Sequence, residues 1–455
     1  MAKKTINYIC SECGYKSAMQ YGKCPSCKSF GTMKEEIIDN TPSTNNRITS
    51  KNTLANKLKE IVASNTSNLL KTDIGEFDRV VGGGLVADSV NVISAPPGTG
   101  KSTLLLSVSQ ALANKDHKVL YIAGEESESQ IKLRAERILS TISENIYIKS
   151  ETNLETILST IDNVSPEFLI IDSIQMLFSS ECDGALGGEK QLLHCTSSIL
   201  NKAKNADKSM CVFFVGQVTK DDELRGSREF EHMVDAVFTL SVGDDSGVLR
   251  MFKSTKNRFG DTSEVGLFEM KEEGLQELTN PNKYFITERT TPVSGSAITA
   301  IKEGSRTIAI EINALAESNN FTYPSRISQG ISKDFLQIVL AVMENKLSSN
   351  TKKKDIYVQT SNGIRVKDTY IGLGIVAAID SAVNKIPLAS DIAFVGEVSL
   401  TGEIKKVPNI DRIISDFERM GFKEIVIPAN NTSKKYSKII VKEIGTIKEL
   451  KDIIK

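Results

Sequence analysis

The segment VNVISAPPGTGKST, residues 90–103, decides the fold of this chain. The apolar run VNVIS predicts a buried strand, and LLLSVSQALAN, which follows the segment, predicts a helix. Between strand and helix lies a loop with the spacing of a phosphate-binding motif: Ala95-Pro96-Pro97-Gly98-Thr99-Gly100-Lys101-Ser102-Thr103. Its glycines let backbone N–H groups close around phosphate oxygens, and the helix N-terminus adds a partial positive charge. The segment therefore predicts an ATP- or ADP-binding site, with an ordinary glycine-rich turn as the alternative.

Two side chains of this loop have predicted roles. Lys101 can reach the β- and γ-phosphates of ATP, and the Ser102 hydroxyl can ligate Mg²⁺. The first position of the motif, usually glycine, is Ala95 in this chain. A methyl group fits at that position provided that the backbone needs no positive φ.

The surrounding sequence predicts the rest of this domain. From about residue 69 to 285, short apolar runs such as KVLYIAG, FLIIDS and MCVFFVGQ alternate with helical patterns. Strands without polar alternation, separated by amphipathic helices, favour a mostly parallel sheet covered on both faces. VDAVFTLSV, VLRMFKSTKN and SEVGLFEM then follow without helices between them, so we expect the sheet to end in antiparallel strands. The predicted fold class is α/β.

Polar residues follow three of the predicted strands, at the edge where the ligand crevice of such a sheet lies. Asp172 ends FLIID and is predicted to be the second ligand of Mg²⁺. Glu125 and Glu126 follow KVLYIAG; Glu125 is predicted to orient the attacking water, whereas Glu126 could equally cap the next helix. Gln217 ends MCVFFVGQ and could sense the γ-phosphate. At this edge, the predicted catalytic residues are Lys101, Glu125, Asp172 and Gln217.

The N-terminal residues 1–33 contain two CxxC pairs, Cys10-Ser-Glu-Cys13 and Cys24-Pro-Ser-Cys27. Four thiolates at this spacing predict a closed tetrahedral zinc site, which is structural because no position is open to a substrate. Two disulfides, idle cysteines and a rubredoxin-like iron site are the alternatives. The next segment, 34–68, is rich in Asn, Ser, Thr and Lys and is predicted to be a linker.

Composition limits the kinds of partner. The 455 residues carry 56 basic and 57 acidic side chains, a net charge of −1 that excludes a globally basic nucleic-acid binder. Residues 1–34 nevertheless hold six lysines against one acid, Glu12, and could seek an anionic partner. No stretch approaches the roughly 18 consecutive apolar residues of a membrane span, and no apolar signal region begins the chain. We therefore expect a cytoplasmic protein with reduced cysteines and no membrane partner.

Four further motifs, taken with the phosphate loop and the cysteines, resemble the RadA (Sms) family of bacterial DNA-repair proteins: GEES at 124–127, GQVTK at 216–220, EHMVD at 231–235 and KNRFG at 256–260. The similarity covers essentially the whole chain, and KNRFG is its most diagnostic element. It implies a RecA-like ATPase core at 69–285, a homo-hexameric ring and action on branched recombination intermediates. Single-stranded DNA and a recombinase filament are the implied partners. Ala95 and Gln217 depart from the family pattern and are expected to affect the catalytic rate rather than the fold.

Lys256 and Arg258 lie two apart where a predicted strand ends, so in extended geometry both cations point to the same side. A solvated edge that blocks strand pairing is the ordinary explanation. In a RecA-like ring, they are expected to act as fingers on the γ-phosphate bound by the neighbouring subunit. Lys220 and Arg225, in the loop after Gln217, are expected to contact DNA in the channel of the ring.

From residue 286 to 455 the α/β pattern restarts, and this part resembles the protease domain of Lon. Lon proteases use a serine nucleophile and a lysine base, but Ile371 stands where the serine would be and Asp411 takes the place of the lysine. The resemblance therefore implies a scaffold without proteolysis. A Lon-type protease and a RecA-like switch ATPase acting on protein partners are the alternatives to a DNA-dependent, branch-migrating ATPase.

Overall fold

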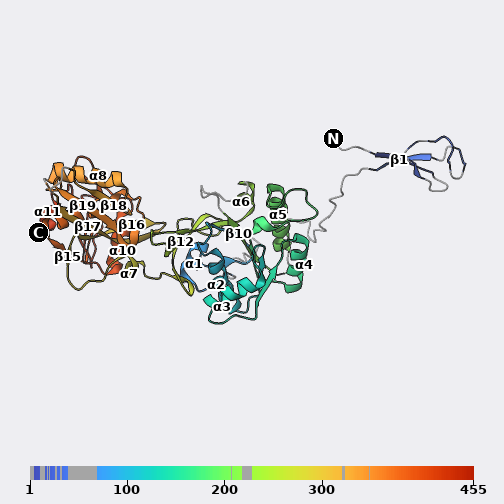
Figure 1. The fold of residues 1–455 in the computed structure, drawn as a ribbon, viewed down its shortest axis with the longest axis horizontal. Coiled ribbons are helices and arrows are strands. Elements are labelled where there is room, and N and C mark those ends of the chain that lie inside the picture. Colours follow the sequence, from blue (N-terminus) through green and yellow to red (C-terminus); the bar gives the residue numbers. More distant parts are fainter. Residues whose placement is uncertain are drawn as a thin grey trace. The chain divides into compact units, whose positions relative to one another are not determined.

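The computed structural model describes most of residues 69–454 and parts of the N-terminal segment. The described ranges are 5–10, 16–17, 19, 21–25, 28–30, 33–38, 69–205, 208–217, 228–319, 323–347 and 349–454. The chain forms two compact units, residues 1–63 and 64–455 (Figure 1). Within the described ranges, no helix is both long enough and apolar enough to cross a bilayer.

The N-terminal unit contains an antiparallel sheet in the order β2-β1-β3. The strands are β1 (Thr5–Cys10), β2 (Lys16–Ser17) and β3 (Met33–Ile38). β3 pairs with the whole length of β1 and so crosses the predicted boundary between residues 33 and 34. The predicted linker is wrong for residues 34–38, because their ladder with β1 holds them in the sheet. Its remaining residues, 39–68, lie outside the described part of the chain.

Cys24 of this unit is 1% exposed. Its carbonyl accepts a hydrogen bond from the Lys28 amide at 2.9 Å, and Lys28 has a left-handed φ of 62°. The Cys10 side chain and all of Cys13 and Cys27 lie outside the described residues. The four-thiolate site therefore stays a prediction.

The second unit begins with a nine-stranded sheet in which six neighbouring strands are parallel and three antiparallel strands complete one side. In spatial order the strands are β14 (Gly274–Glu277), β13 (Val265–Lys271), β12 (Leu249–Asn257), β11 (Ala236–Val242), β6 (Val90–Ala95), β10 (Cys211–Gln217), β9 (Phe168–Asp172), β7 (Val119–Ala123) and β8 (Ile146–Ser150). The predicted α/β class and the antiparallel end of the sheet are confirmed.

Helices cover both faces of this sheet, which explains why its strands lack polar alternation. Ile93 and Ala95 pack on the face of α1 (Gly75–Val81), α2 (Lys101–Ala113) and α3 (Glu128–Ile138). Val90 and Val92 pack on the face of α4 (Leu154–Val164), α5 (Glu189–Asn205) and α6 (Arg228–Met233). Smaller elements are β4 (Leu69–Leu70), β5 (Leu85–Val86) and the 3-10 turn η2 (Ile174–Met176).

A seven-stranded mixed sheet forms the C-terminal part of the same unit. Its strands, in spatial order, are β18 (Arg326–Gln329), β19 (Lys354–Thr360), β17 (Arg306–Ser318), β16 (Ser296–Glu303), β21 (Ile392–Phe394), β24 (Glu424–Pro428) and β25 (Ile440–Ile444). α8 (Lys333–Val342) and α9 (Gly372–Asn384) pack on one face, and α10 (Ile410–Met420) packs on the other. This confirms the predicted second α/β fold.

Short elements complete the C-terminal part. The helical ones are α7 (Pro281–Phe285), η3 (Met343–Leu347), η4 (Ser361–Gly363), η5 (Thr369–Ile371) and α11 (Leu450–Ile453). The extended ones are β15 (Val293–Ser294), β20 (Pro387–Leu388) and the hairpin of β22 (Glu397–Val398) and β23 (Ile404–Lys405).

The two sheets of this unit share one apolar cluster. Leu249 and Met251 of β12 pack in the cluster that also contains Ile308 of β17 and Phe285 of α7. Phe285 is thus part of the C-terminal core, although the predicted boundary places it in the preceding domain. The junction is a packed interface rather than a flexible linker.

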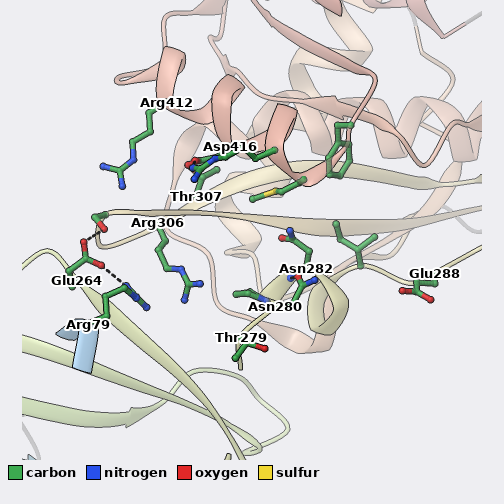
Figure 2. Close-up of a pocket in the computed structure, with 16 residues that line it drawn as sticks. Arg79, Glu264, Thr279, Asn280, Asn282, Glu288, Arg306, Thr307, Arg412 and Asp416 are labelled. Atoms are coloured by element: carbon green, nitrogen blue, oxygen red, sulfur yellow. Dashed lines mark hydrogen bonds and ion pairs between the residues drawn. The ribbon is translucent and has the colours of Figure 1, made fainter. Parts of the chain in front are cut away.

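A buried carboxylate stabilises this junction. Glu76 of α1 accepts hydrogen bonds from Arg306 of β17, from Arg79 and from the Leu267 amide, at 2.8, 2.8 and 2.9 Å. Arg79 also pairs with Glu264. Figure 2 shows Arg79 and Arg306 facing the cavity of about 750 Å³ that lies between the two parts.

We expect Glu76→Gln to destabilise the junction by roughly 3 kcal/mol, because removing one partner leaves the other charges of a buried network uncompensated. The value lies at the lower end of the usual range because Arg79 and Arg306 keep 28% and 25% of their side chains exposed. Lys253→Gln is the matched control, since its more exposed pair with Glu303 also joins the two parts and should cost under about 1 kcal/mol. Urea unfolding followed by circular dichroism measures both variants. Equal midpoints would contradict the prediction.

Candidate nucleotide site

The phosphate loop joins β6 to α2 with the backbone that its glycines permit. Gly98 and Gly100 have φ values of 77° and 102°, which residues with a side chain rarely adopt. Gly100 is also closely approached, because a Cβ there would lie 2.6 Å from Cε of Met270. α2 begins at Lys101, and the loop lines a cavity of about 470 Å³ at the carboxyl ends of the parallel strands. Unpaired N–H groups at a helix start are suited to bind an anion.

Lys101 lines this cavity, and its Nζ donates a hydrogen bond to the Ala95 carbonyl at 2.7 Å. Burial lowers the pKa of Lys101, while the carboxylates of Asp172 and Glu125 act to raise it. Ala95 is the buried last residue of β6, and its φ is not positive. A methyl group is therefore compatible with the first position of this loop.

Asp172 and Ser102 meet beside the loop. Ser102 Oγ donates to Asp172 Oδ2 at 2.8 Å, and the Tyr121 hydroxyl donates to the same oxygen at 2.5 Å. Burial raises the pKa of Asp172, and the hydrogen bonds from Tyr121 and Ser102 oppose this shift. Hydroxyl and carboxylate oxygens are ligands that Mg²⁺ prefers, so this pair could hold a magnesium ion beside bound phosphates.

The two glutamates after β7 have different partners. Glu125 accepts a hydrogen bond from the Ser173 hydroxyl at 2.5 Å and lines the same cavity. Glu126 forms a two-point ion pair with Arg134 of α3, with both N–O distances at 2.7 Å. The cap of α3 is Ser127, whose hydroxyl reaches the amide of the third helical residue. The alternative that Glu126 caps this helix is therefore wrong.

Gln217 ends β10 and is paired with Ala95 in the parallel ladder, so its backbone lies at the edge that carries the phosphate loop. The Gln217 side chain lies outside the described residues, as do Lys220 and Arg225. The contacts predicted for these three side chains therefore stay predictions.

Lys256 and Arg258 lie at the end of the sheet where the parallel strands begin, opposite the end that carries the phosphate loop. In the ladder, Asn257 pairs with Ala236, which in turn pairs with Asn91 near the amino end of β6. Four strand residues, about 13 Å, separate this level from the phosphate loop. Neither cation therefore joins the loop of its own chain.

These two cations contact the same short segment, residues 231–235. Lys256 Nζ donates to two backbone carbonyls of the segment at 2.7 and 2.8 Å. Arg258 is 59% exposed and pairs with Asp235 at 3.3 Å. Both side chains thus reach the same segment, and Arg258 is the less constrained of the two.

Four side chains of this site were not predicted from the sequence: Tyr121, Arg134, Met270 and Arg250. Tyr121 and Met270 belong to apolar strands, where an aromatic or methionine side chain is usually part of the core. Arg250 is 6% exposed within the apolar first residues of strand β12, LRMF. A charged residue in such a run was the available signal, because buried arginines need specific partners.

Sequence profiles of three known families match successive parts of the chain. A zinc-ribbon profile described as "Rubredoxin metal binding domain" matches residues 8–35, "AAA domain" matches 58–204, and "Lon protease (S16) C-terminal proteolytic domain" matches 273–453. Among solved structures, one described as an ATPase domain aligns with 48% of this chain and with 93% of its own chain. The sequence identity is 15% and the TM-score is 0.40.

Curated relatives match over nearly their full length. The DNA repair protein RadA of Bacillus subtilis strain 168 is 40% identical over 435 residues, which is 95% of this chain and 94% of the relative. RadA of Listeria monocytogenes is 38% identical over 434 residues, covering 94% and 93%. RadA of Streptococcus pyogenes serotype M1 is 38% identical over 432 residues, covering 94% of both chains.

A zinc ribbon, a RecA-like ATPase core and a Lon-like C-terminal domain in one chain define a class of modular ATPases. The predicted zinc ribbon and the predicted architecture are confirmed at this level. The chain belongs to the RadA family of DNA repair proteins.

Proposed function

We propose that this chain hydrolyses ATP to move on single-stranded DNA and to promote branch migration in recombination intermediates. The observation that carries the proposal is the convergence of Lys101, Ser102, Asp172 and Glu125 on one glycine-loop cavity, in a chain of a DNA-repair family. The family name supports DNA as the substrate. The cavity supports nucleotide as the source of energy.

The predicted site residues have separate roles in the proposed hydrolysis. The loop Ala95–Thr103 binds the phosphates, and Lys101 stabilises charge that develops on the γ-phosphate oxygens. Ser102 and Asp172 would hold Mg²⁺, which neutralises charge on the β- and γ-phosphates when bound. Glu125, held by Ser173, orients the attacking water, and Gln217 senses the γ-phosphate.

A homo-hexameric ring supplies the remaining charge from a neighbouring copy. Arg258 lies at the sheet edge opposite its own phosphate loop, so it is suited to act on the nucleotide of another chain. To reach a neighbouring chain, Arg258 must give up one ion pair with a carboxylate, whereas Lys256 must give up hydrogen bonds to two backbone carbonyls. Arg258 is therefore the principal finger that we propose, with Lys256 beside it.

DNA is proposed to bind in the channel of this ring through Lys220 and Arg225. The lysine-rich zinc ribbon provides a second contact with DNA or with a recombinase filament. ATP turnover measured without DNA, with single-stranded DNA and with forked DNA tests the proposal. Turnover that DNA leaves unchanged would contradict it and would favour a switch ATPase acting on protein partners.

We propose that the Lon-like domain, residues 286–455, has no proteolytic activity. Ile371, at the expected serine position, is fully buried, and Asp411, at the expected lysine position, accepts hydrogen bonds from Thr432 and Tyr436. These bonds lower the pKa of Asp411, so it cannot replace a lysine base near neutral pH. Casein degradation, assayed with ATP and DNA present, should be absent; cleavage would revive the protease alternative.

We expect one zinc ion per chain, held by Cys10, Cys13, Cys24 and Cys27. Cys10→Ser should release the metal and unfold residues 1–33, because a structural zinc site contributes directly to folding. Basal ATP turnover should persist, since the ribbon belongs to a separate compact unit. Metal analysis and turnover of the full chain measure both effects. Iron in the freshly purified protein, or no metal, would contradict the assignment.

A further inference from the structure

Strand β12 contacts the phosphate loop with one face and the C-terminal core with the other. Arg250 is 6% exposed, and its Nε donates to the Thr99 carbonyl of the loop at 2.8 Å. Leu249 and Met251, its neighbours along the strand, pack in the apolar cluster of the C-terminal part. Successive strand residues point to opposite faces of the sheet, so a shift of β12 changes its contacts with both the phosphate loop and the C-terminal core.

The bond from Arg250 sets the orientation of one phosphate-binding N–H group. In a trans peptide the C=O and N–H groups point in opposite directions. Because the Thr99 carbonyl is held by Arg250, the Gly100 N–H of the same peptide points away from β12. Glycine tolerates many backbone conformations, so this peptide would otherwise be free to rotate.

A second set of bonds continues from Arg250 into the C-terminal part. Arg250 Nη1 donates to the Gly247 carbonyl at 2.6 Å, in the turn between β11 and β12. Asp244, in the same turn and 7% exposed, accepts from one backbone amide of the turn, from the first amide of β12 and from the Tyr284 hydroxyl at 3.0 Å. Tyr284 lies on α7, so the turn is tied to both the loop and the C-terminal core.

We propose that Arg250, Asp244 and Tyr284 form a relay that couples nucleotide in the cavity to the C-terminal domain. Arg250 is a positioning residue that acts through the Thr99–Gly100 peptide. Nucleotide that orders the loop also orders the turn and α7, and by linkage a restraint on the C-terminal domain changes nucleotide affinity. The relay rests on the proposed ATPase function.

The first arm of the test compares two replacements of Arg250. Arg250→Met leaves a carbon at the position of Nε, whereas Arg250→Gln keeps an N–H donor there without the charge. We expect Arg250→Met to raise the KM for ATP and the Kd for a fluorescent ADP about tenfold, the value of one lost hydrogen bond, with kcat within about threefold. Arg250→Gln should restore most of the affinity, and Lys253→Gln, on the opposite face of β12, should match the parent.

The second arm measures the coupling itself in the full chain. ADP should slow hydrogen exchange of α7 amides in the parent and in Lys253→Gln. Tyr284→Phe removes one hydroxyl and should bind ADP within about twofold of the parent, since only the far end of the relay is cut. It should lose the ADP-dependent protection of α7.

The outcomes separate this relay from the ATPase proposal. An unchanged Kd and KM in Arg250→Met, or a fall in kcat alone, would overturn the positioning role while leaving the ATPase intact. ADP-dependent protection that persists in Tyr284→Phe would overturn the relay, whether or not Arg250→Met folds. A parent that binds no ADP would overturn both proposals.

Discussion

Lys101→Ala is expected to reduce ATP turnover by roughly a thousandfold, because loss of one preorganised donor to developing negative charge has an effect of this size. The Lys101 amine lies in the cavity that Asp172 and Glu125 also line, 2.7 Å from the Ala95 carbonyl. From there it can exchange this carbonyl for phosphate oxygens. Phosphate release by the purified full chain, with DNA present, measures the effect.

Two further variants make this test specific. Glu125→Gln should bind ATP with the affinity of the parent but fail to hydrolyse it, because it keeps the shape of the side chain and removes its charge. Lys132→Ala removes an exposed lysine of α3 that pairs with Glu136 and should hydrolyse ATP at the parent rate. Near-normal turnover by Lys101→Ala would show that the loop is not the phosphate site.

The phosphate loop could be predicted because anion binding imposes local rules. Gly98 and Gly100 supply positive φ values, and Lys101 follows them directly at the helix start. Asp172 could be predicted because parallel strands bring their carboxyl ends to one edge of a sheet. It lies 70 residues from Ser102 in the sequence, yet strand order alone brings the two together.

Contacts that depend on the three antiparallel strands of the sheet could not be predicted in this way. Arg250 and Thr99 are 151 residues apart, and no spacing rule relates the strand that carries Arg250 to the loop that carries Thr99. The interpretation of residues 34–38 as linker failed for a similar reason, since β3 is defined by its pairing with β1 rather than by an apolar pattern. The cap of α3 is Ser127 rather than Glu126, and its hydroxyl accepts from a helix amide, as serine commonly does.

Arg258→Ala is expected to bind ATP normally and to lose turnover by roughly a thousandfold or more, the usual effect of removing an arginine finger. Its guanidinium is 59% exposed and pairs with Asp235 alone among the described residues, so its loss should leave the fold intact. Arg419→Ala is the matched control, because Arg419 is 79% exposed and also pairs with one carboxylate, Asp416. It should hydrolyse ATP at the parent rate.

Mixing the Arg258→Ala and Lys101→Ala proteins should restore part of the lost turnover. Each variant is inactive alone, because every boundary in its ring lacks either the loop lysine or the finger. In a mixed ring, some boundaries combine an intact Lys101 from one chain with an intact Arg258 from the next. Co-purification of two differently tagged variants verifies subunit exchange, and phosphate release measures the recovery. If subunits exchange but ATP turnover does not recover, Arg258 does not act at the nucleotide site of the neighbouring chain. If assembled Arg258→Ala hydrolyses ATP at the parent rate with DNA present, Arg258 is not an arginine finger.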